Sequence, residues 1–573
     1  MKLPIGQSDF KKIIDQKYNF VDKTLFIKEI IDEPAAVILI TRPRRFGKTL
    51  NLSMLKYFFA EEVVSIPTKG LFEGLKISQE DSFYRDQQGQ YPVVSLSFKD
   101  VKEDNFELAY RKVYGIIIQL YDEFSYLQES PSLSSTQKSF YTRILTREAD
   151  QADLEDSLQM LTKCLFLHHR QQPIVLIDEY DAPIHAGYLN GFYEKIIKFF
   201  RSFFSAGLKD NTLLYKAVLT GILRVSRESL FSGVNHLDVF SVLSPRYSSY
   251  FGFTETEVTD LLIQAKMDDK LPQVKDWYNG YHIGETTLYN PWSIINFIQK
   301  KGVFDLYWVN TSDNELIKTL LSGASFSFKD AFENLLQGSS LEKFIDTNIV
   351  FSDLKRNNPT SIWSLFLMSG YLTTRKYQLT GDGPLCELSI PNKEVSFLFK
   401  KIIKEWFSKD YGLDWYNEFL DALLTGNIDK FASELKKIME HTVSIHDTGR
   451  SPEAFYHGLM IGLTASLHAS PFYEIRSNRE SGEGRYDYVI ISREDQKLSI
   501  LMEFKQVKEP EGKVLSESKM RDLLKQTAET ALDQISQKSY CTEIEQRGLT
   551  RVLKIGLAFS GKKFCLVHVL SGV

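Results

Sequence analysis

The sequence contains little cysteine, and its cysteines are not grouped. The chain of 573 residues has four, which are Cys164, Cys386, Cys541 and Cys565. None of them has the paired spacing that is typical of a zinc site. We therefore expect reduced thiols within hydrophobic cores, as in a cytoplasmic protein, and no disulfide framework.

Long hydrophobic runs and a strong net charge are also missing. No segment approaches the roughly 18 apolar residues of a membrane span, and the first ten residues lack the apolar core of a signal peptide. We therefore expect a cytoplasmic protein with no membrane partner. The formal net charge is −5, so contact with a nucleic acid would have to use local basic patches. The length predicts about three or four globular domains.

One stretch, I-T-R-P-R-R-F-G-K-T-L at positions 40–50, organises the rest of the chain. It follows a short apolar run that predicts a buried strand, and apolar residues then recur at helical spacing. A strand, a tight loop ending in Gly47-Lys48-Thr49 and a helix form an arrangement that binds phosphate, because backbone N–H groups and the positive helix end face the anion. Lys48 is predicted to contact the β- and γ-phosphates, and Thr49 to hold Mg²⁺.

The loop departs from the usual pattern G-x-x-x-x-G-K-[ST] at its first position. Arg42 stands where the first glycine is expected, and Pro43 follows it. Arginine does not readily adopt the left-handed backbone angles that glycine allows, so this loop must begin differently. Arg44, Arg45 and Phe46 complete the predicted nucleotide site, and the two arginines add charge to it. The alternative is a basic loop of an α/β domain that binds no nucleotide.

A second apolar run, Ile174–Ile177, ends in two acidic residues, Asp178 and Glu179. A carboxylate at such a strand end is where a P-loop fold holds Mg²⁺, and a neighbouring acid can orient the attacking water. Asp178 is therefore predicted to bind the metal and Glu179 to serve hydrolysis, with Asp181 as the alternative acid. A solvated acidic turn is the competing interpretation, which the four branched apolar residues before it disfavour.

A third predicted strand, Leu213–Leu219, ends in Thr220. A polar residue at this place could sense the γ-phosphate, and Arg224 or Arg227 could stabilise transition-state charge. The alternative is a turn that begins a helix and carries solvated arginines. The sequence leaves the roles of both arginines open.

With L-P-I-G-Q-S-D-F-K-K-I-I at its start, then F-V-D-K-T, R-P-R-R-F-G-K-T and L-I-D-E-Y-D, the chain resembles the AAA-ATPase-like bacterial proteins. These usually carry a PD-(D/E)xK nuclease-like domain at the C-terminus, and the resemblance covers nearly the whole chain. It implies ATP as the nucleotide, and since the family normally lacks the first glycine of the loop, Arg42 does not argue against ATP. It also covers W-Y-N-G-Y-H-I (277–283) and L-Y-N-P-W-S-I-I (288–295), to which no chemistry is assigned.

A second candidate site lies near the C-terminus. Asp487 precedes an apolar strand, and Glu503 and Lys505 lie two residues apart on the next strand, so they face the same side. Two carboxylates can hold Mg²⁺ while the lysine stabilises charge or positions a water. Glu453, on a helix that begins near Ser451, could add a third carboxylate. The alternative is a solvated acid–lysine pair, although the apolar residues before Glu503 predict a buried strand, where such a pair is costly.

The string G-E-G-R-Y-D followed by E-F-K also resembles the PD-(D/E)xK motif. Tyr486 stands where the proline of that name is expected. The resemblance further implies that Gln534 and Tyr540, on the following helix, match later positions of the motif. Gln534 is therefore counted with Glu179, Asp487, Glu503 and Lys505 among the candidate catalytic residues.

Together these features predict an α/β protein of three domains. Residues 1–252 would form a P-loop NTPase domain with a parallel sheet, residues 253–445 a helical lid, and residues 446–573 a restriction-endonuclease-like domain. Two strands around G-D-G-P (381–384) leave a winged-helix-like lid and a plain helical linker equally open, and the polar stretch Gln128–Lys138 predicts a surface loop.

The predicted function is an ATP- and Mg²⁺-dependent nuclease that acts on DNA, in defence or in the control of mobile elements. The alternative is an ATP-driven switch or scaffold whose nuclease-like domain binds nucleic acid or protein without cutting. Homo-oligomerisation is compatible with both.

Overall fold

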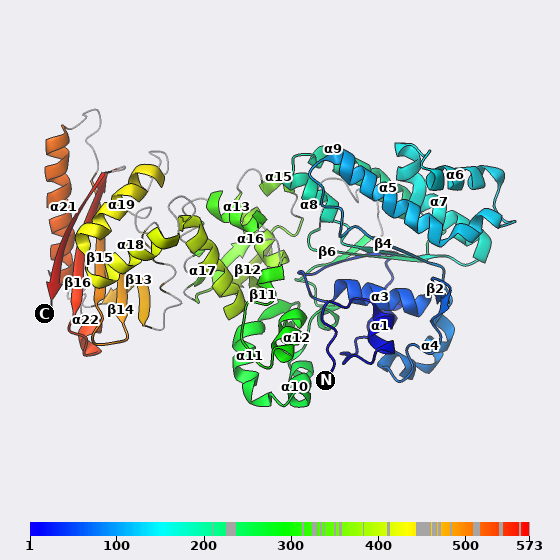
Figure 1. Cartoon of the computed structure of the whole chain (residues 1–573), viewed down its shortest axis with the longest axis horizontal. Helices are drawn as coiled ribbons and strands as arrows, with labels where there is room; N and C mark the ends of the chain where they lie inside the picture. Colours follow the sequence, from blue (N-terminus) through cyan, green and yellow to red (C-terminus); the bar gives the residue numbers. More distant parts are fainter. Residues whose placement is uncertain are drawn as a thin grey trace. The chain divides into compact units, whose positions relative to one another are not determined.

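The computed structural model of the chain is drawn in Figure 1. It describes residues 1–209, 211–224, 237–311, 315–323, 328, 331–332, 335–336, 338–348, 351–354, 358–381, 383–408, 413–442, 460, 464, 467, 472–481, 484–507, 516–537, 542–560 and 563–571. The chain divides into two compact units, one formed by residues 1–320 and 340–395 and the other by residues 321–339 and 396–573. The three-domain division with boundaries at 252 and 445 stays a prediction.

The first unit is built on a sheet of five parallel strands. Their order across the sheet is β4 (Val93–Ser97), β5 (Ile174–Asp178), β6 (Lys216–Gly221), β1 (Val37–Thr41) and β7 (Leu237–Phe240). The three central strands are buried at every residue, which explains their continuous runs of branched apolar side chains. Since all the strands are parallel, the loops after β1, β5 and β6 meet at one edge of the sheet, where such folds bind ligands.

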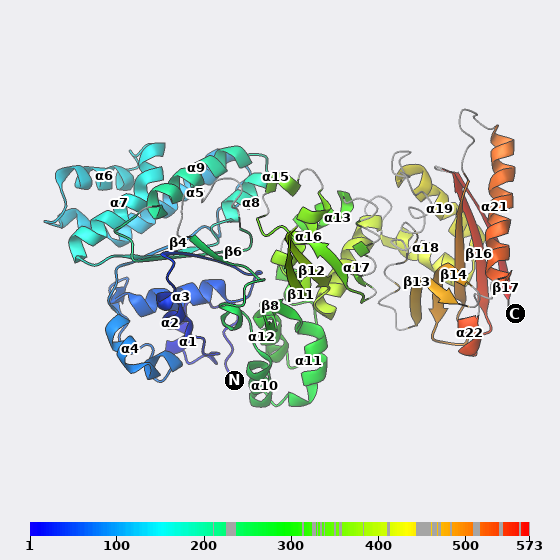
Figure 2. The ribbon, with the colours of Figure 1, turned by 180° about the vertical axis from the view of Figure 1, so that it is seen from behind.

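Helices cover both faces of this sheet (Figures 1 and 2). On one face lie α1 (Phe10–Asp15) and α3 (Lys48–Phe59), and on the other lie α5 (Phe106–Glu123), α7 (Gln151–His169) and α9 (Tyr193–Leu208). Helix α9 buries four phenylalanines, at positions 199, 200, 203 and 204, and Phe98 after β4 packs its ring against Phe200 at 5.0 Å. This core fixes α9 against the sheet.

Two predictions about the first unit were wrong in detail. The stretch Gln128–Lys138 is not a loop throughout, because α6 (Ser135–Thr146) begins within it. Ser134 and Gln137 form a reciprocal capping box there, which the surrounding Pro and Ser residues concealed. The strand predicted at 213–219 is displaced to Lys216–Gly221, so Thr220 lies within β6 and not after it.

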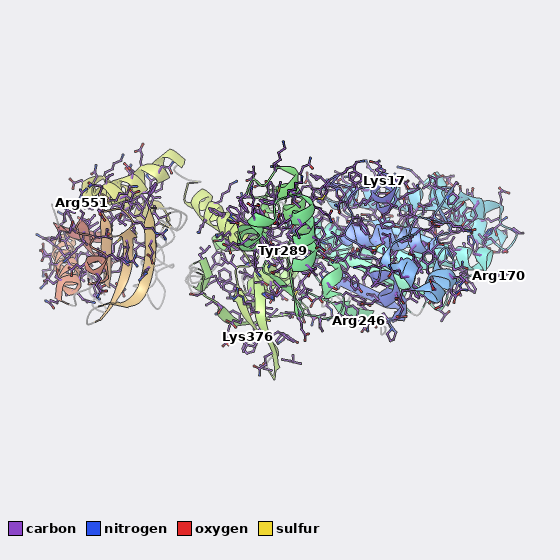
Figure 3. The ribbon with its side chains drawn as sticks, turned by 90° about the horizontal axis from the view of Figure 1, so that it is seen from below. Lys17, Arg170, Arg246, Tyr289, Lys376 and Arg551 are labelled. Atoms are coloured by element: carbon purple, nitrogen blue, oxygen red, sulfur yellow. The ribbon has the colours of Figure 1, made fainter. Side chains whose placement is uncertain are left out.

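The remainder of the first unit begins with helices around a small hairpin. They are α10 (Glu255–Gln264), α11 (Leu271–Tyr278) and α12 (Pro291–Gln299), with β8 (Tyr281–Ile283) and β9 (Thr286–Leu288) between the last two. Thr254 and Glu257 form a reciprocal capping box at the start of α10. Tyr289, labelled in Figure 3, is buried in the core that these helices share.

A second sheet in this unit has three antiparallel strands, in the order β10 (Leu341–Phe344), β12 (Gly383–Ser389) and β11 (Thr373–Thr380). Helices α15 (Phe351–Leu354) and α16 (Pro359–Met368) lie between β10 and β11 in the chain, and α17 (Lys393–Ser408) follows β12. Helix α16 is buried from Ser361 onward. A plain helical linker therefore does not describe this region, because it contains a sheet.

The second unit has its own five-stranded sheet, in chain order from β13 to β17. The strands are β13 (Tyr473–Ser481), β14 (Gly484–Ser492), β15 (Ser499–Gln506), β16 (Val552–Ser560) and β17 (Lys563–Ser571), and only the β15–β16 pair is parallel. That pair requires a crossover, which includes α21 (Glu517–Gln537) and α22 (Thr542–Gln546). A Cβ at Gly556 of β16 would lie 2.2 Å from the carbonyl oxygen of Ala528, so glycine allows α21 to pack closely on the sheet.

The other face of this sheet packs against α18 (Leu413–Thr425) and α19 (Ile428–Thr442). Phe419, Phe431 and Leu435 from these helices share one core with Tyr488 and Ile490 of β14. The sheet is therefore covered on both faces, which explains why its central strands consist largely of consecutive apolar residues. Within the described residues, none of the helices is long and apolar enough to span a bilayer.

Candidate nucleotide and metal sites

The phosphate loop joins β1 to α3, and its first glycine position is taken by a buried arginine. Arg42 is fully buried, and its Nη1 donates hydrogen bonds to the carbonyls of Thr41, Phe240 and Ser241 at 2.8–3.0 Å. Burial lowers the pKa of its guanidinium to about 9. Arg42 therefore fastens the end of β1 to the chain after β7. The left-handed backbone lies further along, at Arg45 (φ 65°) and Gly47 (φ 85°).

Lys48 is the first residue of α3, and its ammonium lies under the loop. Its Nζ donates hydrogen bonds to the carbonyls of Arg42 at 3.0 Å and Pro43 at 2.9 Å. Burial lowers the pKa of Lys48, whereas the charge of Glu179, and then that of Asp178, raises it. The two acids predicted from the second strand thus lie near the lysine predicted from the loop.

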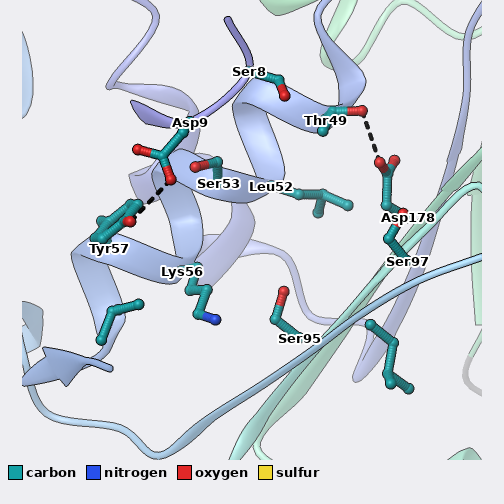
Figure 4. Close-up of a pocket in the computed structure, with 12 residues that line it drawn as sticks. Ser8, Asp9, Thr49, Leu52, Ser53, Lys56, Tyr57, Ser95, Ser97 and Asp178 are labelled. Atoms are coloured by element: carbon teal, nitrogen blue, oxygen red, sulfur yellow. Dashed lines mark hydrogen bonds between the residues drawn. The ribbon is translucent and has the colours of Figure 1, made fainter. Parts of the chain in front are cut away.

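Asp178, at the end of β5, receives a hydrogen bond on each carboxylate oxygen. Thr49 Oγ1 donates to Oδ2 and Thr220 Oγ1 donates to Oδ1, both at 2.7 Å. The hydroxyl of Thr49 is drawn with Asp178 in Figure 4. Three strand or helix ends therefore converge on one carboxylate. The sequence predicted that Thr220 could sense the γ-phosphate, but not its bond to Asp178, because the sequence does not reveal that β6 lies between β1 and β5.

A cavity of about 220 Å³ adjoins this carboxylate (Figure 4). Besides Thr49 and Asp178, its polar lining includes the hydroxyl residues Ser8, Ser53, Ser95 and Ser97. Mg²⁺ prefers oxygen ligands, keeps several of its waters and uses one or two carboxylates. The donor set of Thr49 and Asp178 beside this polar space fits such an ion.

The two further acids of the D-E-Y-D string have different environments. Asp181 is buried, and its Oδ2 accepts hydrogen bonds from the backbone N–H groups of Ile222 and Leu223 at 2.8 and 2.9 Å. Burial raises the pKa of Asp181, and these N–H groups lower it. Glu179 is only partly buried and has left-handed backbone angles (φ 49°), which are strained for a residue with a side chain. Asp181 thus holds the chain after β6, and Glu179 is the acid nearer solvent.

The remaining predicted loop residues contact aromatic side chains, and the charge of Arg44 lowers the pKa of Lys48. Phe46 is fully buried with its ring edge-on to Tyr281 at 5.0 Å, so only its backbone is placed to meet a nucleotide. The Arg45 guanidinium lies 4.4 Å from the ring centre of Trp292. The carbonyl of Arg44 accepts a hydrogen bond from Trp308 Nε1 at 3.0 Å. The sequence left the roles of Arg224 and Arg227 undecided. Burial lowers the pKa of Arg224. Arg227 lies outside the described residues.

The C-terminal site brings four predicted residues together. Asp487 on β14 lies beside Glu503 on β15, since Tyr488 pairs with Met502 in the antiparallel ladder. The N–H of Phe504 donates to Asp487 Oδ2 at 2.8 Å, and Lys505 Nζ donates to Glu503 Oε1 at 3.3 Å.

From α21, Gln534 Nε2 also donates to Glu503 Oε1. Helix α21 therefore adds a polar contact to the two-stranded site.

Glu503 is 1% exposed, and its pKa is raised to about 7. Burial is the main cause and the charge of Asp487 the second, while Lys505 acts in the opposite direction. Two adjacent carboxylates of this kind fit a divalent cation, which would relieve their repulsion. Glu453 and Tyr540 lie outside the described residues. Within the described part of the chain, no group of three or more His, Cys, Asp or Glu side chains could hold a metal ion.

Comparison with known proteins confirms the resemblance. Residues 4–231 match the family model described as predicted AAA-ATPase, and residues 451–569 match that of the PD-(D/E)XK nuclease superfamily. The chain is 28% identical over 527 residues to an uncharacterized protein in the vnfD 5′ region of Azotobacter chroococcum mcd 1, which covers 90% of this chain and 92% of that protein.

Two solved structures are also similar. They are the Walker-type ATPase of Pyrococcus abyssi (12% identity, TM-score 0.35) and the Aeropyrum pernix ORC1 protein in complex with DNA (10% identity, TM-score 0.24). Each comparison covers 70% of this chain and 98% of the other. The family models, together with the parallel sheet and phosphate loop described above, identify the chain as a protein with a domain of the predicted AAA-ATPase family followed by a domain of the PD-(D/E)XK nuclease superfamily.

Proposed function

We propose that the protein binds and hydrolyses ATP at the loop between β1 and α3. Lys48 contacts the β- and γ-phosphates, and Thr49 and Asp178 hold Mg²⁺. Glu179 orients the attacking water, since the carboxylate of Asp181 is already engaged by two backbone N–H groups. The supporting observation is the convergence of Thr49 and Thr220 on Asp178 at the carboxyl edge of the parallel sheet.

The second part of the proposal is Mg²⁺-dependent cleavage of DNA at the C-terminal site. Asp487 and Glu503 hold the ion, which when bound makes a water more acidic and neutralises charge on the phosphate. Lys505 lies beside Glu503 and offsets charge on the attacked phosphate. Gln534 fixes the orientation of the Glu503 carboxylate. The observation that carries this assignment is the buried carboxylate of Glu503, with the carboxylate of Asp487 and the ammonium of Lys505 next to it.

ATP binding in the first unit would then switch the activity of the nuclease domain. Such a DNA-cutting switch suits a role in defence or in the control of mobile elements. The chemistry of the two sites is separate, so a substitution at one site should leave the other chemically intact.

The test uses the full-length protein with Mg²⁺, ATP and a panel of double- and single-stranded DNA and RNA. Wild type should hydrolyse ATP and produce cleaved DNA, with loss of cleavage when the divalent cation is chelated. Glu179→Gln should bind ATP with wild-type affinity but hydrolyse it at least about a hundredfold more slowly. Unchanged hydrolysis in that variant would move the water-orienting role to another group.

The alternative function is decided by the same panel. If the wild-type protein binds DNA or a protein in an ATP-dependent way but cleaves nothing with any divalent cation, the nuclease-like domain is a binding module. The ATPase part of the proposal would stand in that case, because its readout is separate.

A further inference from the structure

Four consecutive residues of the phosphate loop contact one surface of the chain that lies beyond residues 4–231. Pro43 abuts Gly370, where an added Cβ would lie 2.8 Å from the Cβ of Pro43. The next three residues contact aromatic side chains, as described above: the Arg44 carbonyl meets Trp308, the Arg45 guanidinium meets Trp292, and the Phe46 ring meets Tyr281. We call Tyr281, Trp292, Trp308 and Gly370 the loop platform.

The platform accounts for two strings to which the sequence assigned no chemistry. W-Y-N-G-Y-H-I supplies Tyr281, and L-Y-N-P-W-S-I-I supplies Trp292. Tyr281 also lies 6.0 Å from Trp308, ring centre to ring centre, and Trp308 lies 5.3 Å from Tyr371. Tyr281, Trp308 and Tyr371 therefore form one packed aromatic group within the first unit.

Trp308 acts at the strained part of the loop. Trp308 is 1% exposed, and its indole N–H donates a hydrogen bond to the carbonyl of Arg44. The next residue, Arg45, has left-handed backbone angles that arginine adopts only at a cost. Successive N–H groups around such a residue form a concave anion site. The hydrogen bond from Trp308 fixes the peptide that precedes this turn.

Glu394 ties the platform to a helix that leaves the first unit. Its carboxylate is fully buried, and it accepts hydrogen bonds from the backbone N–H of Trp308 at 2.6 Å and from Ser293 Oγ at 2.8 Å. Glu394 therefore contacts Trp308 directly and the residue that follows Trp292 in the chain. Glu394 is the second residue of α17, which continues to Ser408 in the second unit.

We propose that Trp308 is a positioning residue for the phosphate loop and that Glu394 links the nucleotide site through it to α17. The proposal rests on ATP binding at Lys48. In the described structure, Lys48 is bonded to the carbonyls of Arg42 and Pro43. A bound phosphate competes for that ammonium, so the carbonyls of the loop rearrange against the platform. Trp308 and Glu394 then pass the change to the first turn of α17.

The test compares Trp308→Phe with Trp277→Phe in the full-length protein. Trp277 stacks on Phe304 at 5.5 Å in the neighbouring helical core, so it is a matched loss of an indole away from the loop. In the free protein, amide hydrogen exchange of residues 44–47 should quicken in Trp308→Phe only. The dissociation constant of Mg·ATP should rise about three- to tenfold, as expected for one lost hydrogen bond.

The proposed link between the nucleotide site and α17 is measured by amide hydrogen exchange in the first turn of that helix. With saturating Mg·ATP, wild type should show slower exchange both in the loop and in residues 393–396. Trp308→Phe and Glu394→Gln should keep the slowing in the loop but lose it in α17. Glu394→Gln should change the dissociation constant less than about twofold, because it leaves the hydrogen bond to Arg44 in place.

Each contrary result has a distinct meaning. Wild-type exchange and affinity in Trp308→Phe would overturn the positioning role. Slowing in α17 that persists in Glu394→Gln would overturn the link. If wild type binds no ATP, the proposed nucleotide function fails, whereas loop exchange in the free protein still decides whether Trp308 positions the loop.

Discussion

The two candidate sites use their carboxylates in opposite ways. Asp178 accepts a hydroxyl hydrogen bond on each oxygen, from Thr49 and Thr220, so donors already stabilise its charge. Glu503 is buried beside a second carboxylate, Asp487, and its pKa is raised to about 7. Both carboxylates thus have donors, since Lys505 and Gln534 donate to Glu503, but only the second site places two carboxylates side by side, whose repulsion a cation would relieve. Substitutions that remove one carboxylate charge at each site should therefore have different effects at the two sites.

The largest effect is expected from Asp487→Asn. Loss of one metal-binding carboxylate should reduce Mg²⁺-dependent cleavage by about a thousandfold, since metal-ion catalysis contributes several kcal/mol. Cleavage of a labelled DNA measures this. The control is Asp495→Asn, in the exposed turn between β14 and β15. Equal cleavage by the Asp487 variant and this control would exclude Asp487 from the site.

A buried carboxylate outside both sites extends the comparison. The pKa of Glu394 is raised from 4.5 to about 7, mainly by burial, although hydrogen bonds from Ser293 and from backbone N–H groups lower it. Because the folded pKa lies above the unfolded value, its contribution to stability is fully present below about pH 4.5. That contribution is lost as the pH rises through about 7.

We expect Glu394→Gln to remove this loss. Between pH 4.5 and 8 the free energy of opening of β1 and β5 should fall about 3 kcal/mol further in wild type than in the variant. Hydrogen exchange of the amides in those strands measures it. Parallel pH profiles for the two proteins would show that Glu394 is ionised in the folded state throughout that range.

Lys48→Ala should weaken Mg·ATP binding by about a hundredfold, the effect of losing hydrogen bonds from a charged donor. Calorimetric titration measures the affinity, and circular dichroism should show an intact fold. Lys28→Ala is the matched control, because Lys28 is a surface lysine paired with Asp32. Mg²⁺ binding at the C-terminal site should be unaffected, since Lys48 takes no part in that site. An unchanged affinity would remove the loop from nucleotide binding.

The smallest expected effects are changes in the free energy of unfolding, and they should have opposite signs in Asp178→Asn and Asp487→Asn. In metal-free buffer, Asp178→Asn should lower the free energy of unfolding of the first unit by about 1–2 kcal/mol, because two hydroxyls lose a charged acceptor. Asp487→Asn should instead raise that of the second unit by about 1 kcal/mol, because it relieves repulsion of Glu503. Urea unfolding, followed by hydrogen exchange in each unit, gives both signs. The same sign for both variants would contradict the contrast between the sites.

Local patterns in the sequence were enough to predict many of the strands and helices. The strands that end at Thr41 and Asp178 appeared as short branched apolar runs, and the spacing of Glu503 and Lys505 placed them on one side of a strand. These features depend on residues a few positions apart, which is the range over which periodicity operates. The prediction of a loop through Gln128–Lys138 was an error of this local kind. The capping box of α6 lies within that stretch, but its Pro and Ser residues are typical of loops.

Contacts between distant residues were decided only by the tertiary structure. Thr220 reaches Asp178 because β6 is inserted between β1 and β5, and strand order is not written in any single strand. Arg42 could be recognised as unusual, but its carbonyl partners after β7 could not be named. Trp308 meets the Arg44 carbonyl across 264 positions of the chain. A buried N–H needs an acceptor wherever the packing brings one, so the sequence determined that this tryptophan needs a partner and only the fold determined which.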